Sequence, residues 1–228
     1  MLRTIRICLI VLGLIGVSFS AVLPSDVETA LDKFLNTITS YDNFKMEFQI
    51  TAQLAGINAT AGGVLVYDKS GKFKLELGQL FYLINDGKNL WFYTPLTREY
   101  SRGDLPLREL MQFFAPSATT PTLGPALSFL LKQILQSEDF ALQSAFIREE
   151  ALESKKSLAL TFTSGKGFEV KIWLEPKSYD LQQIGVLAKI GEGQKIVVYL
   201  KVIKLSTNIS LPSNAFVFVP PPGAKLKE

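Results

Sequence analysis

The chain has 228 residues, of which 47% are hydrophobic and 20% charged, so it can bury a sizeable core and is not a disordered polypeptide. It contains no histidine and a single cysteine. These counts exclude a Ser-His-Asp triad, a Cys-His pair and imidazole-based zinc or iron sites. The 24 Lys and Arg residues exceed the 21 Asp and Glu residues by three.

The N-terminus has the three parts of a secretory signal peptide. Arg3 and Arg6 precede the apolar run 7–17, and small residues flank a cleavage position between Ser20 and Ala21. The alternative is a membrane anchor. Eleven helical residues, however, reach only about 16 Å, roughly half of a bilayer core. We therefore predict a leader that is removed.

Cleavage divides the chain into a signal peptide, residues 1–20, and one domain, residues 21–228. The domain keeps 22 cationic and 21 acidic residues, a net charge of +1, and it loses Cys8 with the leader. Without disulfides, a secreted domain must be held together by its core, which favours a bacterial periplasm. No dense basic tract indicates a nucleic-acid partner.

A single amphipathic helix is predicted at the start of the domain, from Pro24 to about residue 40. Ser25 and Glu28 have the spacing of a capping box. One apolar stripe follows at helical spacing, and its members are Val27, Ala30, Leu31, Phe34, Leu35 and Ile38.

From Phe44 onwards, apolar and polar residues alternate with the period of two that is typical of half-buried antiparallel strands. Short Gly, Asp and Asn turns separate the strands, as in a meander. The expected strands are 44–50, 63–67, 72–77, 80–84 and 90–93, then 157–163, 168–174, 182–190 and 195–204, and a last short strand holding Phe216 and Phe218.

Residues 105–136 have a different pattern, which predicts two short apolar helices around a Pro/Thr/Ser loop. No internal repeat or linker divides the domain. The sequence thus predicts one α+β domain with a curved, unclosed antiparallel β-barrel (a half-barrel) and helices covering its open apolar side. The apolar residues fit a packed core or an apolar cavity equally well, since both have the same composition.

Carboxylates give no indication of catalysis. Glu149 and Glu150 are adjacent, so on a helix they would point about 100° apart. Asp86 and the other turn or strand carboxylates are expected to be solvated charges. Gly62 and Gly63 are expected in a turn, without the Lys-Ser/Thr of a phosphate-binding loop. We predict no enzymatic activity, no cofactor and no metal.

Two segments carry a resemblance to a known family. Residues 86–95, DGKNLWFYTP, and residues 214–223, NAFVFVPPPG, resemble the "DGK-x-LW-x-Y-x-P" and "F-x-F-x-P-P-x-G" segments of the LolA family, periplasmic carriers of outer-membrane lipoproteins. The triplet 31–33, LDK, is also similar to one in that family. The resemblance extends over essentially the whole domain.

The resemblance implies an apolar cavity that receives the acyl chains of lipoproteins, beneath a helical lid. It implies as partners lipoproteins or lipid acyl chains, an inner-membrane extraction complex and an outer-membrane receptor, for a monomeric protein. The residues expected to line the cavity or its lid are Leu31, Met46, Phe48, Phe73, Leu75, Leu77, Trp91, Met111 and Phe114.

One turn departs from the family pattern. Members commonly have Arg-Pro after the second strand, where this chain has Lys69 and Ser70. Lys69 is the expected contact to the lid, but lysine lacks the planar donor fork of arginine. The alternative function is therefore a lipid-binding or lipoprotein-sensing regulatory protein of the same fold, without a transport role.

Overall fold

The computed structural model describes residues 23–54, 57–103, 142–190 and 194–227. The predicted leader lies outside these residues. The two helices predicted within residues 105–136, with Met111 and Phe114, also lie outside them.

The described chain consists of one helix and a twelve-stranded sheet. No helix in this part of the chain combines the length and apolarity needed to cross a bilayer. The elements are α2 (Ser25–Ser40), β1 (Asn43–Leu54), β2 (Ile57–Asp68), β3 (Phe73–Leu77), β4 (Phe81–Asn85), β5 (Leu90–Thr94), β6 (Glu99–Arg102), β7 (Leu142–Leu152), β8 (Lys155–Ser164), β9 (Phe168–Leu174), β10 (Leu181–Ile190), β11 (Gln194–Thr207) and β12 (Lys225–Leu226).

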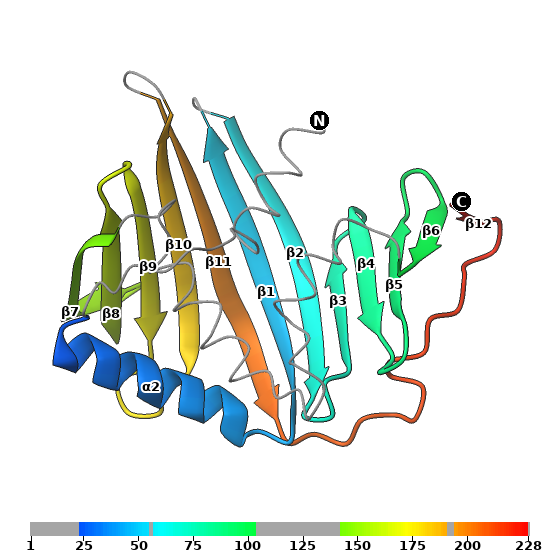
Figure 1. Ribbon diagram of the computed structural model, residues 1–228, viewed down its shortest axis with the longest axis horizontal. Coiled ribbons are helices and arrows are strands. Elements are labelled where there is room, and N and C mark those ends of the chain that lie inside the picture. The colour runs from blue at the N-terminus through cyan, green and yellow to red at the C-terminus, as the bar shows by residue number, and fades with distance from the viewer. Residues whose placement is uncertain (1–22, 55–56, 104–141, 191–193, 228) are drawn as a thin grey trace.

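The strands form one curved sheet that does not close (Figure 1). Its order is β12-β6-β5-β4-β3-β2-β1-β11-β10-β9-β8-β7, so the two meanders β1–β6 and β7–β11 join where β1 pairs with β11. All pairs are antiparallel except β12 with β6. The half-barrel sheet predicted from the alternating pattern is confirmed. Of the predicted covering helices, the described residues include α2 alone.

The register aligns the apolar residues of neighbouring strands on one face. Met46 of β1 pairs with Leu65 of β2, which pairs with Leu75 of β3. The same row continues through Leu83 and Phe92. Because side chains alternate along a strand, these residues share a face, which we call the inner face.

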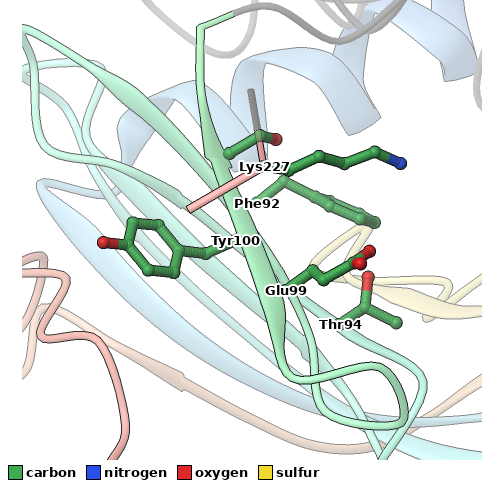
Figure 2. Close-up of a pocket in the computed structure, with 6 residues that line it drawn as sticks. Phe92, Thr94, Glu99, Tyr100 and Lys227 are labelled. Carbon is green, nitrogen blue, oxygen red and sulfur yellow. The ribbon is translucent and has the colours of Figure 1, made fainter. Parts of the chain in front are cut away.

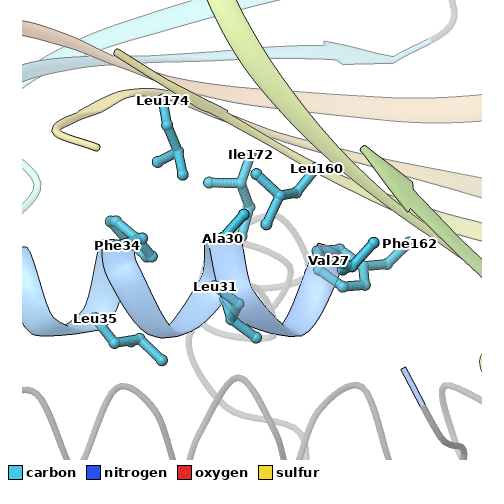
Figure 3. Packing of buried hydrophobic residues seen from close by; sticks show 9 residues of the cluster. All are labelled: Val27, Ala30, Leu31, Phe34, Leu35, Leu160, Phe162, Ile172 and Leu174. Atoms are coloured by element: carbon cyan, nitrogen blue, oxygen red, sulfur yellow. The ribbon is translucent and has the colours of Figure 1, made fainter. Parts of the chain in front are cut away.

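The helix α2 covers one half of the inner face. Val27, Ala30 and Phe34 point from α2 towards side chains of β8 and β9 (Figure 3). Eleven apolar side chains that remain partly exposed pack around this cluster, so burial of the helix stripe holds α2 on the sheet. The buried cluster consists of Val27, Ala30, Leu31, Phe34, Leu35, Leu160, Phe162, Ile172 and Leu174.

Several details differ from the sequence prediction. The helix begins at Ser25 with Pro24 at its N-cap, and no side chain caps it. The predicted capping box of Ser25 and Glu28 is therefore wrong. Phe216 lies in a turn and Phe218 in the irregular residues after it, so neither belongs to a strand. The strands β6 and β7 were not predicted, because the four residues of β6 are too few to show alternation and β7 is interrupted by charged residues.

Candidate binding site on the inner face

The second half of the inner face carries its own apolar cluster. Phe44, Tyr67, Phe73 and Leu83 are buried at its centre. Met46 and Leu75, predicted cavity residues, are half-buried and pack against it. Among the described residues, Ile38 and Tyr41 are the apolar side chains that reach this cluster from outside the sheet. We call these residues of β1–β5 the open half of the inner face, because within the described residues the helix α2 reaches them only through Ile38.

The structure brings together most of the predicted site residues. Met46, Phe48, Phe73, Leu75 and Leu77 lie on the inner face of β1 and β3. Leu31 is also fully buried, but it belongs to the α2 cluster over β8 and β9. The sequence pattern therefore predicted correctly that these residues share one surface. Whether that surface binds a ligand stays a prediction.

Phe48 lies directly over a glycine of the neighbouring strand. It pairs with Gly63 of β2, and a Cβ added to Gly63 would lie 2.3 Å from the Phe48 ring. Gly63 and its neighbour Gly62 are inside β2, not in the turn that the sequence analysis expected. The absence of a side chain at Gly63 is what allows the Phe48 ring to occupy this position.

Trp91 does not lie with the other predicted cavity residues. It pairs with Ile84 and Arg102, which places it on the outer face of the sheet. There its ring stacks on Phe218 at 5.2 Å between centroids. Residues 86–95 and 214–223, which carry the family resemblance, thus contact each other. The C-terminal segment packs on β5 through the contact between Phe218 and Trp91. This corrects the predicted role of Trp91.

Asp86 organises the turn that precedes Trp91. Its carboxylate accepts hydrogen bonds from the backbone N–H groups of Lys88 and Asn89 and from the Trp91 indole, at 2.6 to 3.1 Å. Partial burial of Asp86 raises its pKa, but these hydrogen bonds and one from the Asn89 amide outweigh it, lowering the pKa to about 2. Asp86 is therefore part of the fold, not the solvated charge expected.

We expect the contribution of Asp86 to stability to depend on pH. A carboxyl group whose pKa is lower in the folded state stabilises it above its unfolded pKa, near 4, and loses this effect as the pH falls towards 2. Chemical unfolding at several pH values should show that wild type is more stable than Asp86→Asn at pH 6. The difference should shrink between pH 4 and pH 2, and a constant difference would contradict this role.

Lys69 contacts the connection between the helix and the sheet. Its ammonium group lies 2.5 Å from the Asp42 carboxylate, and its backbone N–H donates to the Asp42 carbonyl. Both side chains are about two-thirds exposed, at 66% and 67%, so the ion pair adds little free energy. The predicted contact between Lys69 and a lid involves residues outside the described part of the chain and stays a prediction.

The outer face carries a hydrogen-bonded cluster that the residue pattern alone does not predict. Glu150 of β7 accepts from Lys171 at 2.7 Å and from the Trp173 indole at 3.2 Å. Burial opposes ionisation of Glu150, but the hydrogen bonds from Lys171 and Arg148 lower its pKa. The sequence feature that points to this cluster is Trp173, which occupies a polar position of β9 and needs a hydrogen-bond partner for its indole N–H. The cluster joins β7 to β9.

A small pocket lies where β5 and β6 meet Lys227, the residue after β12 (Figure 2). Its volume is about 40 Å³, and Phe92, Thr94, Glu99, Tyr100, Ser101 and Lys227 line it. This volume holds a water molecule or two and is far too small for an acyl chain. Within the described residues, no group of three or more Cys, Asp or Glu side chains is placed to hold a metal ion.

Comparison with known proteins identifies the fold but no close relative. No protein-family model and no curated protein matches the chain. The structure is similar to that of an uncharacterized conserved protein from Thermus thermophilus, with a TM-score of 0.55 and 13% identity over 89% of this chain and 99% of that one. This likeness shows that the fold is one already seen in a solved structure.

Two further solved structures were matched at lower TM-scores. One is a LolA superfamily protein from Nitrosomonas europaea, with a TM-score of 0.38 and 10% identity over 84% of this chain and 97% of that one. The other is a chain of the MucA/MucB complex from Pseudomonas aeruginosa, with a TM-score of 0.47 and 12% identity over 86% of this chain and 62% of that one. The structural neighbours thus include a member of the LolA superfamily.

Proposed function

We propose that this chain is a periplasmic carrier that binds the acyl chains of lipoproteins on the inner face of its half-barrel and carries them from the inner to the outer membrane. The observation that supports the proposal is the open half of the inner face. It is a broad apolar surface, continuous with the core beneath α2, and its described cover is limited to Ile38 and Tyr41.

Acyl chains provide what such a surface needs. Each CH₂ group moved from water to an apolar surface contributes about 0.8 kcal/mol, so a lipid anchor crosses an aqueous compartment only when its chains are shielded. The cluster residues supply this shielding without catalysis, since no step in carrying a lipid makes or breaks a bond. Phe73 and Phe44 form the base of the surface, while Met46 and Leu75 remain partly accessible.

A carrier can hand its lipoprotein to a receptor only if it binds the acyl chains weakly. Met46 can adapt its flexible thioether chain to ligands of different shape, which suits a site that must bind and hand over many lipoproteins. The chain offers no phosphate-binding loop in its sequence, so we expect an inner-membrane extraction complex to supply the energy for loading and an outer-membrane receptor to accept the cargo.

If acyl chains bind there, a charge on the open half of the inner face should weaken lipid binding strongly. Leu75→Asp places a carboxylate at the centre of the apolar row, where it has no cationic partner in the pairing register. We expect the affinity of the purified domain for a triacylated lipopeptide to fall at least tenfold, measured by titration with a fluorescent derivative.

The matched control is Val66→Asp on the outer face of the neighbouring strand. Val66 pairs with Lys45 and Lys74, so the new carboxylate lies between two cations and away from the inner face. This variant should bind the lipopeptide like wild type. Equal affinity of Leu75→Asp and wild type, with both variants folded by circular dichroism, would contradict the proposed site.

A further inference from the structure

The strand β2 extends well beyond its neighbour β3. Pairing between them runs from Tyr67 with Phe73 to Gly63 with Leu77, and there β3 ends. Residues 57–62 of β2 continue for six residues, about 20 Å of strand, paired with β1 on one side. On the other side, no strand of the described chain pairs with this segment, which we call the free edge of β2.

The backbone of the free edge directs hydrogen-bonding groups outwards. A Cβ added to Gly78, in the turn after β3, would lie 3.6 Å from the Gly62 carbonyl oxygen, so this oxygen points away from β1. The direction of N–H and C=O groups alternates along an antiparallel strand. Asn58, Thr60 and Gly62 therefore present both groups to the free edge, while Ala59 and Ala61 bond to β1.

The side chains of the free edge leave it unprotected. Edge strands are normally blocked by charges, proline or a covering strand, and the two outer edges of this sheet show such protection. β12 covers β6, and β7 carries Arg148, Glu149 and Glu150. The sequence of the free edge, INATAG, has neither a charge nor a proline, and Ile57 is 71% exposed.

The free edge adjoins the open half of the inner face. Ala61 pairs with Ile50 and Ala59 with Ala52, in the residue row that Phe48 and Gly63 begin. Ile57, Ala59 and Ala61 therefore continue the inner face to the tip of the hairpin. Leu80, 47% exposed, lies in the turn that leaves the edge open. A strand added at the free edge would therefore contact apolar side chains on the inner face and not on the outer face.

We propose that the free edge of β2 binds the extended peptide that follows the acylated residue of a lipoprotein, as an added antiparallel or parallel strand. This inference rests on the proposed function. The lipid anchor is attached at the first residue of such a cargo, so the peptide leaves the inner face next to its acyl chains. Backbone pairing recognises many sequences, as a carrier of varied cargo requires.

The size of the edge favours a peptide over a second copy of the chain. A stable specific interface buries about 800 Å² on each partner. A strand edge of six residues, without flanking contacts, covers much less than this. Six residues are enough for a short peptide that is already held by its acyl chains, because the second contact is then intramolecular.

The test uses two probes, a triacylated cysteine with an uncharged eight-residue peptide tail and the same triacylated cysteine without a tail. Thr60→Pro removes an outward N–H and leaves the bonds to β1 intact, as prolines in edge strands do. Thr60→Val is the matched control, because it keeps the N–H and removes the same hydroxyl, which lies 3.5 Å from that of Thr51. Asn58→Pro is a second variant, should the first not fold.

We expect wild type and Thr60→Val to bind the tailed probe about tenfold more tightly than the tail-less one, the effect of one to two hydrogen bonds. In the proline variants the two probes should bind equally. A tenfold advantage that persists in them would overturn the proposal. A dimer in wild type that becomes a monomer in Thr60→Pro would overturn it in favour of a second copy. Failure of the tail-less probe to bind wild type would instead overturn the carrier function itself.

Discussion

Phe162→Ala is expected to lower the free energy of unfolding by about 4 kcal/mol, within the range for removing a buried phenylalanine. Phe162 of β8 is fully buried in the cluster that α2 forms with β8 and β9, and Val27 lies against it (Figure 3). The variant leaves a cavity under the first turn of α2. Denaturant unfolding followed by circular dichroism measures the loss.

Phe146→Ala on the neighbouring strand β7 is the control for this loss. Phe146 lies on the outer face, paired with Thr161, and is 39% exposed. Its truncation should cost about 1 kcal/mol or less, since little of the ring is removed from a packed environment. Equal losses for the two variants would show that the α2 cluster is not the core of this half of the sheet.

Gly63→Ala is expected to destabilise the protein by about 3 kcal/mol, at the upper end of the usual cost of overpacking. The added Cβ would lie 2.3 Å from the Phe48 ring and 2.9 Å from the carbonyl oxygen of Glu76 in β3. The ring can rotate away, but the carbonyl belongs to a paired strand and cannot. The free energy of unfolding and the affinity for acyl chains should both fall, because Phe48 must leave its place on the inner face.

The adjacent glycine provides a control with the same chemical change. A Cβ on Gly62 would have no atom of the described residues within 4 Å, and the Gly62 backbone does not have a positive φ. Gly62→Ala should therefore leave stability unchanged or raise it by about 0.5 kcal/mol, since alanine reduces the freedom of the unfolded chain. Similar losses for both variants would mean that strand entropy, and not contact with Phe48, decides the cost.

The alternation of apolar and polar residues was sufficient to predict the sheet and its inner face. Met46, Phe48, Phe73 and Leu75 could be assigned to one surface because the period of two determines the face of a side chain once a strand is recognised. The helix Ser25–Ser40 was equally evident from its stripe of apolar residues.

Contacts between distant segments could not be predicted in this way. Trp91 belongs to a strand that is apolar on both faces, so periodicity does not say which face it occupies, and its partner Phe218 is far away in the sequence. Glu150 gains its role from Lys171 and Trp173 of a different strand. The same holds for the free edge of β2, which depends on where β3 ends.

Native mass spectrometry of the domain with a triacylated lipopeptide shows whether the inner face holds acyl chains. We expect a one-to-one complex with the lipopeptide, no complex with the same peptide lacking its acyl chains, and loss of the complex in Leu75→Asp but not in Val66→Asp. A folded wild-type protein that forms no complex with the lipopeptide, or binds the deacylated peptide equally well, would contradict it.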